Sequence, residues 1–363
     1  MNTFIKWPGG KESELPLIRK FIPKFTGRYL EPFLGGGAVF FDTKAELALL
    51  NDRSSELISL FECVKERDQD FRYTITRLYD SFRNIDSFIS GNTALTLGLL
   101  DETTQIESFA SALVSELEIE YLPSRERFLD EIQRNLSDKL KRLKKLEAKK
   151  GSLNEEERLN NLEASLKSAF YMYVRFLYNN QNVTANSGTG FRSALFFFIR
   201  EYCYSSMFRY NKKGEFNVPY GGITYNRKDL GKKLEYVFSD QMRDKLVSAE
   251  FSCLDFEEFL SRAKPDSQDF VFLDPPYDSD FSTYAQNSFG RAEQERLHKV
   301  LLNLKARFVL VIKNTDFISE LYRGDFNFFE FDKTYRVSFM NRNSKQVKHL
   351  LITNFKTDIS SLS

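Results

Sequence analysis

A four-residue apolar run, Phe270–Leu273, is followed directly by Asp274-Pro275-Pro276-Tyr277. A short run without polar alternation predicts a strand that is buried on both faces, which is typical of a parallel sheet. The two prolines stiffen the exit from this strand, because proline fixes its own φ and restricts the residue before it. An acid, a backbone carbonyl and an aromatic ring are therefore expected in one rigid turn at the end of a buried strand.

This turn suits a flat ring that carries an exocyclic amine. The carboxylate of Asp274 and the carbonyl of Pro275 can accept hydrogen bonds from such an amine, and Tyr277 offers a face for stacking. The chemistry indicated is methyl transfer to an amino nitrogen. A rigid turn without chemistry would use the same residues, so the motif needs support from the rest of the chain.

Strand-like apolar runs recur in the N-terminal and C-terminal parts of the chain, with helical patterns such as residues 294–305 between them. This alternation predicts an α/β fold with a parallel, doubly wound sheet covered on both faces. The tail, residues 326–355, has no helix-length pattern and predicts antiparallel strands at the edge of that sheet. The predicted strands are residues 29–33, 47–50, 250–253, 269–273 and 308–312, with 326–331, 335–340 and 349–355 in the tail.

The middle of the chain has apolar residues at helical spacing over residues 123–180. Gly151 interrupts this pattern, and Ser152 with Glu155 resembles a capping box, so a helical hairpin is expected over about residues 124–178. Residues 134–150 contain eight basic and two acidic side chains. A solvated helix face accounts for such a charge run, and contact with nucleic-acid phosphates is the alternative.

Composition excludes several classes of protein. The net charge of +1 gives no sign of a nucleic-acid partner, so any such partner must meet local patches. Three dispersed cysteines and two histidines do not form a recognisable metal-binding pattern, and no metal is expected. No apolar leader or membrane-length stretch is present, which predicts a soluble cytoplasmic protein without membrane association.

A glycine-rich turn, residues 31–38 (Glu-Pro-Phe-Leu-Gly-Gly-Gly-Ala), follows the first predicted strand. Glycines allow a tight turn and close approach of a ligand to the backbone. Asp52 lies about 20 residues after Glu31, at the end of the next strand, where nucleotide-binding folds place an acid against ribose hydroxyls. The turn is neither G-x-G-x-x-G nor a Walker A loop, which disfavours dinucleotides and ATP hydrolysis.

The ligand that fits these residues is S-adenosylmethionine, which has an adenosine end and an amino-acid end. Glu31 at the tip of the first strand can meet its cationic amino group. After the third strand, Asp255 and Phe256 could meet the edge and face of the adenine. The same two residues could equally be a helix N-cap and a core residue.

Several segments together resemble one family, the Dam-type (alpha-group) site-specific DNA adenine-N6 methyltransferases. Residues 4–11 resemble its K-W-x-G-G-K, residues 31–37 its E-P-F-x-G-x-G, and residues 274–277 its D-P-P-Y. Residues 208–221 resemble its R-Y-N-x-x-G-x-F-N-V-P-x-G and are the most specific match. The resemblance covers about residues 1–65 and 195–355, but not clearly residues 85–190.

The resemblance implies a Rossmann-like, S-adenosylmethionine-dependent methyltransferase sheet with an inserted, mainly helical DNA-recognition domain. The catalytic domain would comprise residues 1–60 and 229–363, and the target-recognition domain residues 61–228. The implied reaction is methyl transfer to N6 of adenine within a short double-stranded DNA site, GATC or a related sequence, by base flipping and direct in-line transfer. Alternatives are an RNA or protein amino-methyltransferase, or a non-catalytic DNA-binding relative. A cognate restriction endonuclease as partner stays open.

The resemblance also implies roles for individual residues. Lys6 would read one guanine and Arg209 another, because arginine makes a bidentate pair with guanine. Where some members carry an aromatic wedge just past Pro219, this chain has Gly222-Ile223, so Ile223 or Tyr225 is the candidate wedge and GATC is less secure. The implied catalytic residues are Asp274, Pro275, Pro276 and Tyr277; the cofactor-binding residues are Trp7, Lys11, Glu31, Phe33, Gly35, Gly37, Asp52, Asp255, Phe256 and Asp274; the remaining DNA-binding residues are Met207, Asn211, Asn217 and Pro219.

Overall fold

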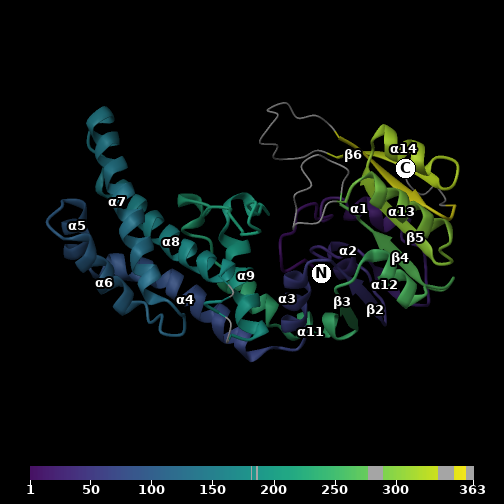
Figure 1. Cartoon of the computed structure of the whole chain (residues 1–363), viewed down its shortest axis with the longest axis horizontal. Coiled ribbons are helices and arrows are strands. Elements are labelled where there is room, and N and C mark those ends of the chain that lie inside the picture. Colours follow the sequence, from purple (N-terminus) through teal and green to yellow (C-terminus); the bar gives the residue numbers. More distant parts are fainter. Residues whose placement is uncertain (181, 185–186, 277–288, 334–346, 357–363) are drawn as a thin grey trace. The chain divides into compact units, whose positions relative to one another are not determined.

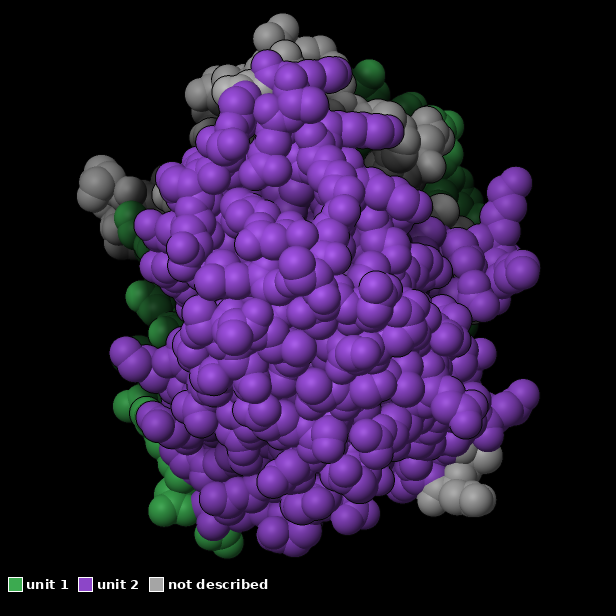
Figure 2. Space-filling view, turned by 90° about the vertical axis from the view of Figure 1, so that its left-hand side faces the viewer, with its two compact units in different colours: residues 1–62, 240–363 green, residues 63–239 purple. Residues whose placement is uncertain are grey.

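The structure, a computed structural model, describes residues 1–180, 182–184, 187–276, 289–333 and 347–356. The chain divides into two compact units, which Figure 2 colours separately. The first unit comprises residues 1–62 and 240–363, and the second unit is the continuous segment 63–239. The predicted boundaries, 60/61 and 228/229, divide the chain in the same order.

Within the described residues, the first unit contains a seven-stranded sheet in the order β3-β2-β1-β4-β5-β7-β6. The five strands β1 to β5 pair in parallel, whereas β7 is antiparallel to both of its neighbours, β5 and β6. The strands are β1 (Tyr29–Glu31), β2 (Ala48–Asn51), β3 (Ala249–Ser252), β4 (Phe270–Leu273), β5 (Arg307–Lys313), β6 (Asn327–Lys333) and β7 (Val347–Thr353).

The α/β class and the Rossmann-like sheet are confirmed. Strand β4 is buried along its whole length, as its unbroken apolar run predicts. The tail forms an antiparallel pair at the sheet edge, β6 and β7. The predicted tail strand at residues 335–340 lies outside the described residues.

Helices pack on both faces of this sheet (Figure 1). On one face, α12, α13 and α14 share a core with Leu30, Val271 and Leu310. On the other face, Phe40 of α2 packs against Tyr29, and Phe25 packs against Phe270. The helices of this unit are α1 (Leu15–Ile18), α2 (Ala38–Asp42), α11 (Asp240–Val247), α12 (Phe256–Ala263), α13 (Arg291–Leu302) and α14 (Asp316–Tyr322), while α3 (Ser55–Lys65) crosses the limit of the two units.

The strand order creates a switch point between β1 and β4. From β1 the chain proceeds to β2 and β3 on one side, while β4 and β5 extend the sheet on the other side. Tyr29 pairs with Phe270 and Leu30 with Val271, so the two strands end next to each other. In open α/β sheets ligands bind outside the carboxyl ends of strands at such a point. Residues that follow β1 and β4 are therefore brought to one edge.

The second unit is helical in its described part. Its long helices α7 and α8 form the expected hairpin, with Gly151 at a φ of 89° ending α7. The predicted capping box at Ser152 was wrong, because Asn154 caps α8 and exchanges hydrogen bonds with Glu157. The helices are α4 (Gln69–Gly91), α5 (Thr93–Leu100), α6 (Ile106–Glu116), α7 (Arg125–Lys150), α8 (Glu155–Asn179), α9 (Thr189–Tyr202) and α10 (Gly231–Val237).

Candidate active site

The turn after β4 carries an ion pair. Nζ of Lys11 lies 2.5 Å from Oδ2 of Asp274 and also donates to the carbonyl of Gly9 at 2.8 Å. Lys11 is 2% exposed and Asp274 19% exposed, so the pair is largely shielded from water. The structure thus brings together two of the residues that were predicted to bind the cofactor. Tyr277, the aromatic residue of the Asp274–Tyr277 motif, lies outside the described residues.

The two prolines of the turn differ in their surroundings. Pro275 is buried and Pro276 is exposed. The carbonyl of Pro276 accepts a hydrogen bond of 3.3 Å from Nε2 of Gln294, a fully buried residue of α13. Gln294 thus ties the turn to the helix that covers β4, a support that no motif in the sequence indicated.

The glycine-rich turn after β1 requires glycine at two positions. Gly35 and Gly37 have φ values of +50° and +71°, which side-chain-bearing residues rarely adopt. A Cβ atom on Gly35 would also lie 2.8 Å from Cδ1 of Trp7. The indole of Trp7 therefore packs directly on this turn, which places the two predicted cofactor-binding elements side by side.

Asp52 fastens the same turn to the end of β2. Its Oδ2 accepts from the backbone N–H of Gly35 and its Oδ1 from that of Ser54, both at 2.9 Å. Burial raises the pKa of Asp52, and the backbone hydrogen bonds oppose that rise. A carboxylate has about four lone-pair positions, so the two backbone contacts leave room for hydroxyl donors.

Asn51 is a site residue that sequence reasoning missed in this role. Its buried side-chain amide donates to the carbonyls of Pro32 and Leu254, each at 3.0 Å. Its oxygen accepts from Leu254 N and from Ser252 Oγ. One amide thereby joins the segments that follow β1, β2 and β3. The available signal was an asparagine at a fully buried strand end, which must find partners there.

Glu31 is buried at the tip of β1, where the hydroxyl of Tyr29 donates to its Oε2 at 2.7 Å. Burial raises the pKa of Glu31 well above its ordinary value, and the negative charges of Asp274 and Asp52 raise it further. Burial lowers the pKa of Lys245 to about 8, and the negative charge of Glu31 opposes that fall. This edge of the sheet therefore concentrates carboxyl groups, which suits a ligand that brings positive charge.

The predicted adenine contacts have structural roles of their own. Asp255 is the N-cap of α12, accepting from Glu257 N at 3.0 Å, and it pairs with Arg296 at 2.6 Å. Phe256 is 2% exposed and lies in the core, with the guanidinium of Arg296 over its ring. These are the N-cap and core roles that the sequence left open. Phe33, which packs on Phe256, is only partly buried.

Residues 203–220 form an irregular two-stranded segment in the second unit, here called the 203–220 hairpin. Bridges join Tyr210 to Phe216 and Cys203 to Tyr220. Nε of Arg209 donates to Oδ1 of Asn217 at 2.9 Å. Arg209 is exposed, and its Nη groups have no partner among the described residues, so they face solvent as a free fork of donors.

The other predicted DNA-binding residues are spread over both units. Asn211 shapes the turn of the hairpin, because its Oδ1 accepts from the N–H groups of Lys213 and Glu215. Pro219 is exposed and Met207 partly exposed in this hairpin, while Lys6 is exposed in the first unit. The two residues considered as wedges differ, since Ile223 is 49% exposed whereas Tyr225 packs against Gly221. Tyr204, which sequence reasoning did not single out, is 39% exposed in the same hairpin.

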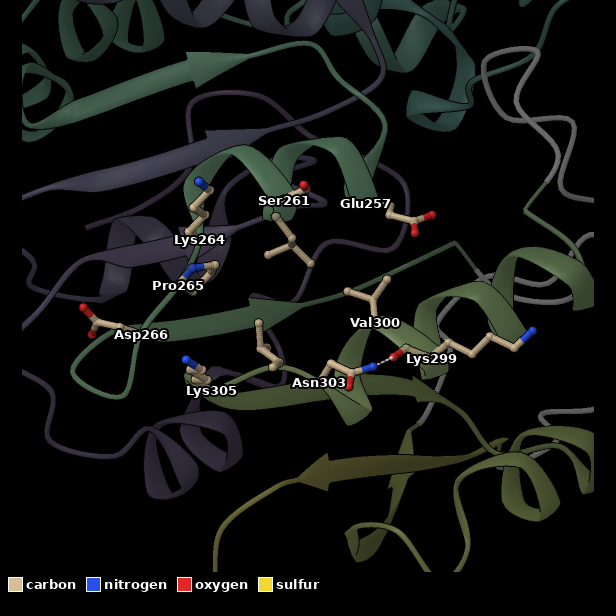
Figure 3. A pocket seen from close by; sticks show the side chains of 11 residues that line it. Glu257, Ser261, Lys264, Pro265, Asp266, Lys299, Val300, Asn303 and Lys305 are labelled. Carbon is tan, nitrogen blue, oxygen red and sulfur yellow. Dashed lines mark hydrogen bonds between the residues drawn. The ribbon is translucent and has the colours of Figure 1, made fainter.

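A hollow of about 680 Å³ lies between α12 and α13, at the end of the sheet where β4 and β5 begin (Figure 3). Its lining includes Lys264 to Asp266, which precede β4, and Lys305, which precedes β5. The side chains of Lys264 and Lys299 point away from each other in Figure 3. Polar groups do not converge here, so the hollow is not part of the candidate site.

The described part of the chain lacks two further features. It holds no group of three or more His, Cys, Asp or Glu side chains arranged to bind a metal ion. Among its helices, none combines the length and the apolar character that crossing a membrane requires.

Comparison with known proteins gives one consistent result. A type II methyltransferase, M.CviBI of Paramecium bursaria Chlorella virus NC1A, is 26% identical over 98% of this chain and 100% of its own length. The DNA adenine methylase of Serratia marcescens is 26% identical over 87% of this chain and 84% of its own length. The type II methyltransferase M.MjaIII of Methanocaldococcus jannaschii is 27% identical over 89% of both chains. The family model of the D12 class N6 adenine-specific DNA methyltransferases matches residues 7–337, and the chain belongs to this family.

Proposed function

We propose that this adenine-specific DNA methyltransferase uses S-adenosylmethionine to methylate N6 of adenine within one short double-stranded sequence, GATC or a related site. The observation that carries the proposal is the Lys11–Asp274 pair at the switch point of the sheet, beside the glycine-rich turn and Trp7. The residues of this edge belong to both cofactor and substrate motifs, so one site serves both ligands.

The proposed cofactor contacts follow from the chemistry of these groups. S-adenosylmethionine supplies an electrophilic methyl group on a positively charged sulfur when it is bound. Glu31 and Asp274 provide carboxylates for its cationic groups, and Asp52 accepts hydroxyl hydrogen bonds. The backbone of Gly35 to Gly37 and the ring of Trp7 form a closely packed wall with no room for further side chains. Phe33, Asp255 and Phe256 complete the proposed contacts, with Phe256 acting mainly as core support.

For the adenine, we propose that the target base leaves the helix, at a cost of a few kcal/mol. N6 then donates hydrogen bonds to the carboxylate of Asp274 and the carbonyl of Pro275. Stacking on Tyr277 returns about 1–3 kcal/mol. Lys11 holds Asp274 in one orientation, so that positioning and electrostatics promote a direct, in-line transfer.

For sequence selection, we propose that Arg209 reads a guanine with its free Nη donors while Asn217 holds Nε. Met207 and Pro219 contact apolar base edges, and Lys6 reads a second guanine. Asn211 acts by shaping the turn between the strands. Ile223 and Tyr204 are the exposed apolar side chains available to wedge into the base stack. Because relatives carry type II names, we also propose a cognate restriction endonuclease with the same target.

The test is methylation of unmethylated plasmid DNA by the purified protein, mapped by base-resolution sequencing. Asp274→Ala is the test variant, and Asp266→Ala, at the other end of β4, is the matched control. We expect N6-methyladenine at one short motif with the wild type and the control, and none with Asp274→Ala. Methylation scattered over many motifs would contradict the proposed specificity, and full activity of Asp274→Ala would contradict the proposed site.

A further inference from the structure

One face of α8 is bonded to the returning strand of the 203–220 hairpin. Tyr171, Arg175 and Asn179 are spaced four residues apart, so they lie along one side of the helix. The hydroxyl of Tyr171 and Nη1 of Arg175 both donate to the carbonyl of Val218, at 2.9 Å each. The backbone of this strand is therefore held by side chains of a helix.

Asn179 makes the most specific of these contacts. Its Nδ2 donates to the carbonyl of Phe216 at 2.9 Å, and its Oδ1 accepts from the N–H of the same residue at 2.8 Å. The side-chain amide thus satisfies both backbone groups of Phe216, as a neighbouring strand would do. Such a two-point contact fixes the height and the direction of the strand at one residue.

The outgoing strand is held from α9 by Arg200, which is 1% exposed. Its Nη1 donates to the carbonyl of Met207 at 2.8 Å and its Nη2 to that of Ser206 at 3.3 Å. Ser205 and Ser206 both have positive φ, at 52° and 51°, which is costly for residues other than glycine. A strained turn of this kind persists only where neighbouring groups hold it, and Arg200 does so directly before the exposed Arg209.

We propose that Asn179, Arg175 and Arg200 are positioning residues, which set the sequence specificity of methylation by fixing the hairpin that carries Met207, Arg209 and Pro219. This inference rests on the proposed function, because it assumes that the hairpin reads DNA. Helix α8, half of the helical hairpin for which only a phosphate contact was considered, thereby becomes the platform of the recognition element. A bidentate contact to guanine tolerates little displacement, so small shifts of this platform weaken discrimination before they weaken catalysis.

The sharpest test uses two neighbouring asparagines. Asn179→Asp keeps size and the acceptor for Phe216 N, but it sets a carboxylate oxygen against the Phe216 carbonyl with no proton between them. Asn180→Asp is the matched control, because among the described residues the hydrogen bond of the Asn180 side chain goes to the carbonyl of Phe176 in its own helix. Both variants are assayed as full chains on duplexes with the mapped target and on duplexes with one changed base pair.

We expect Asn179→Asp to reduce the ratio of kcat/KM between the target and the changed duplex about tenfold, since an unsatisfied buried polar group is costly. KM for DNA should rise, while kcat at saturating DNA and the Kd for S-adenosylmethionine stay within about twofold of wild type. Asn180→Asp should retain the wild-type ratio. In an Arg209→Ala background the additional effect of Asn179→Asp should shrink, because part of it acts through the Arg209 contact.

Three outcomes overturn the inference. One is an unchanged ratio in Asn179→Asp, and another is an equal loss on both duplexes, which denotes a merely structural role. The third is a wild type that methylates without sequence preference, which overturns the proposed specificity together with the positioning. If Asn179→Asp unfolds, Arg175→Gln decides, because it shortens the side chain that bonds the carbonyl of Val218 while Tyr171 keeps that carbonyl satisfied. An unchanged ratio in Arg175→Gln then overturns the inference.

Discussion

Nζ of Lys11 and Oδ2 of Asp274 lie 2.5 Å apart, although 263 positions separate the two residues in the chain. Lys11 belongs to the segment before α1, and Asp274 directly follows β4 at the switch point of the sheet. Because both charges are largely shielded from water, each depends on the other. The pair therefore ties the fold of the N-terminal segment to the chemistry of the catalytic turn.

Replacing Lys11 by methionine should destabilise the protein and abolish methylation. Removing one partner of a shielded ion pair leaves the other charge uncompensated, at a cost of about 3 kcal/mol. We expect a lower free energy of unfolding in urea. The double variant Lys11→Met with Asp274→Asn should recover most of that free energy but no activity. Equal instability of the single and the double variant would show that packing, not charge, is responsible.

Gly35→Ala should reduce both stability and cofactor affinity. The φ of +50° disfavours alanine, and its Cβ would press on the indole of Trp7. We expect a loss of about 1–3 kcal/mol in the free energy of unfolding and a weaker Kd for S-adenosylmethionine by calorimetry. Gly290→Ala is the control, since a Cβ at that position meets open space. Similar behaviour of the two variants would contradict this account of the turn.

Glu31 should make the ligand-free protein less stable as pH rises. Burial raises its pKa in the folded protein, so the folded chain holds the proton more tightly than the unfolded chain. The stability gained is fully present below the ordinary carboxyl pKa of 4.5 and is lost as pH rises through the raised pKa. Glu31→Gln should remove this loss.

The measurement is urea unfolding of the wild type and Glu31→Gln across the pH range from 4.5 upward. We expect the difference in stability to favour the variant increasingly as pH rises. The raised pKa of Asp52 also lowers stability as pH rises. The free energy of unfolding of Glu31→Gln should therefore still fall with pH, but less steeply than that of the wild type. Parallel curves for the two proteins would contradict a raised pKa at Glu31.

Substitutions of Arg209 and Lys212 should affect DNA binding in different ways: one should lower sequence discrimination and the other overall affinity. Arg209→Ala removes a bidentate reader and should lower discrimination at one base pair by about 1–3 kcal/mol. Lys212 is exposed in the same hairpin, and Lys212→Ala should weaken binding to all sequences alike and lower the salt slope by about one unit. Binding curves on single-base variants at several salt concentrations separate the two. Uniform weakening by Arg209→Ala would assign it to phosphates instead.

The basic face of α7 is either a solvated surface or a contact for DNA phosphates, and charge-reversal variants distinguish the two. Lys141, Lys145 and Lys149 are exposed at four-residue spacing. If they meet phosphates, the triple change to Glu should weaken binding to long duplexes and lower the salt slope by up to about three units. Cofactor affinity should not change. The same three changes to Gln provide the control, with a smaller effect expected, and wild-type binding by both variants would identify a solvated face.

A wider deletion would not test this point. Removing residues 124–170 would take core side chains with it, because Phe170 and Leu166 of α8 are buried. Lys139 bonds Asn161 across the hairpin at 2.9 Å, so a cut that joins these two positions removes the outer part, together with the ion pairs of Lys144 with Glu102 and Arg158 with Asp101. Such a truncation should preserve folding, as thermal unfolding can verify.

Local patterns predicted much of the fold. The apolar run before Asp274 predicted β4, because a strand covered on both faces needs no polar alternation. The glycine-rich turn after β1 was readable because positive φ selects glycine whatever the surroundings. The motif residues themselves were recognised by resemblance, which needs no coordinates.

The sequence by itself determined the α/β class, the order of the motifs and the family of the chain. The tertiary structure decided which motif residues meet: Lys11 with Asp274, Asn51 with the segments after β1 and β3, and Asn179 with Phe216. It also decided that Asp255 caps a helix and that Glu31 has a raised pKa. Local patterns encode backbone preference, whereas burial, pairing and pKa depend on groups that lie far apart in the chain and become neighbours only when it folds.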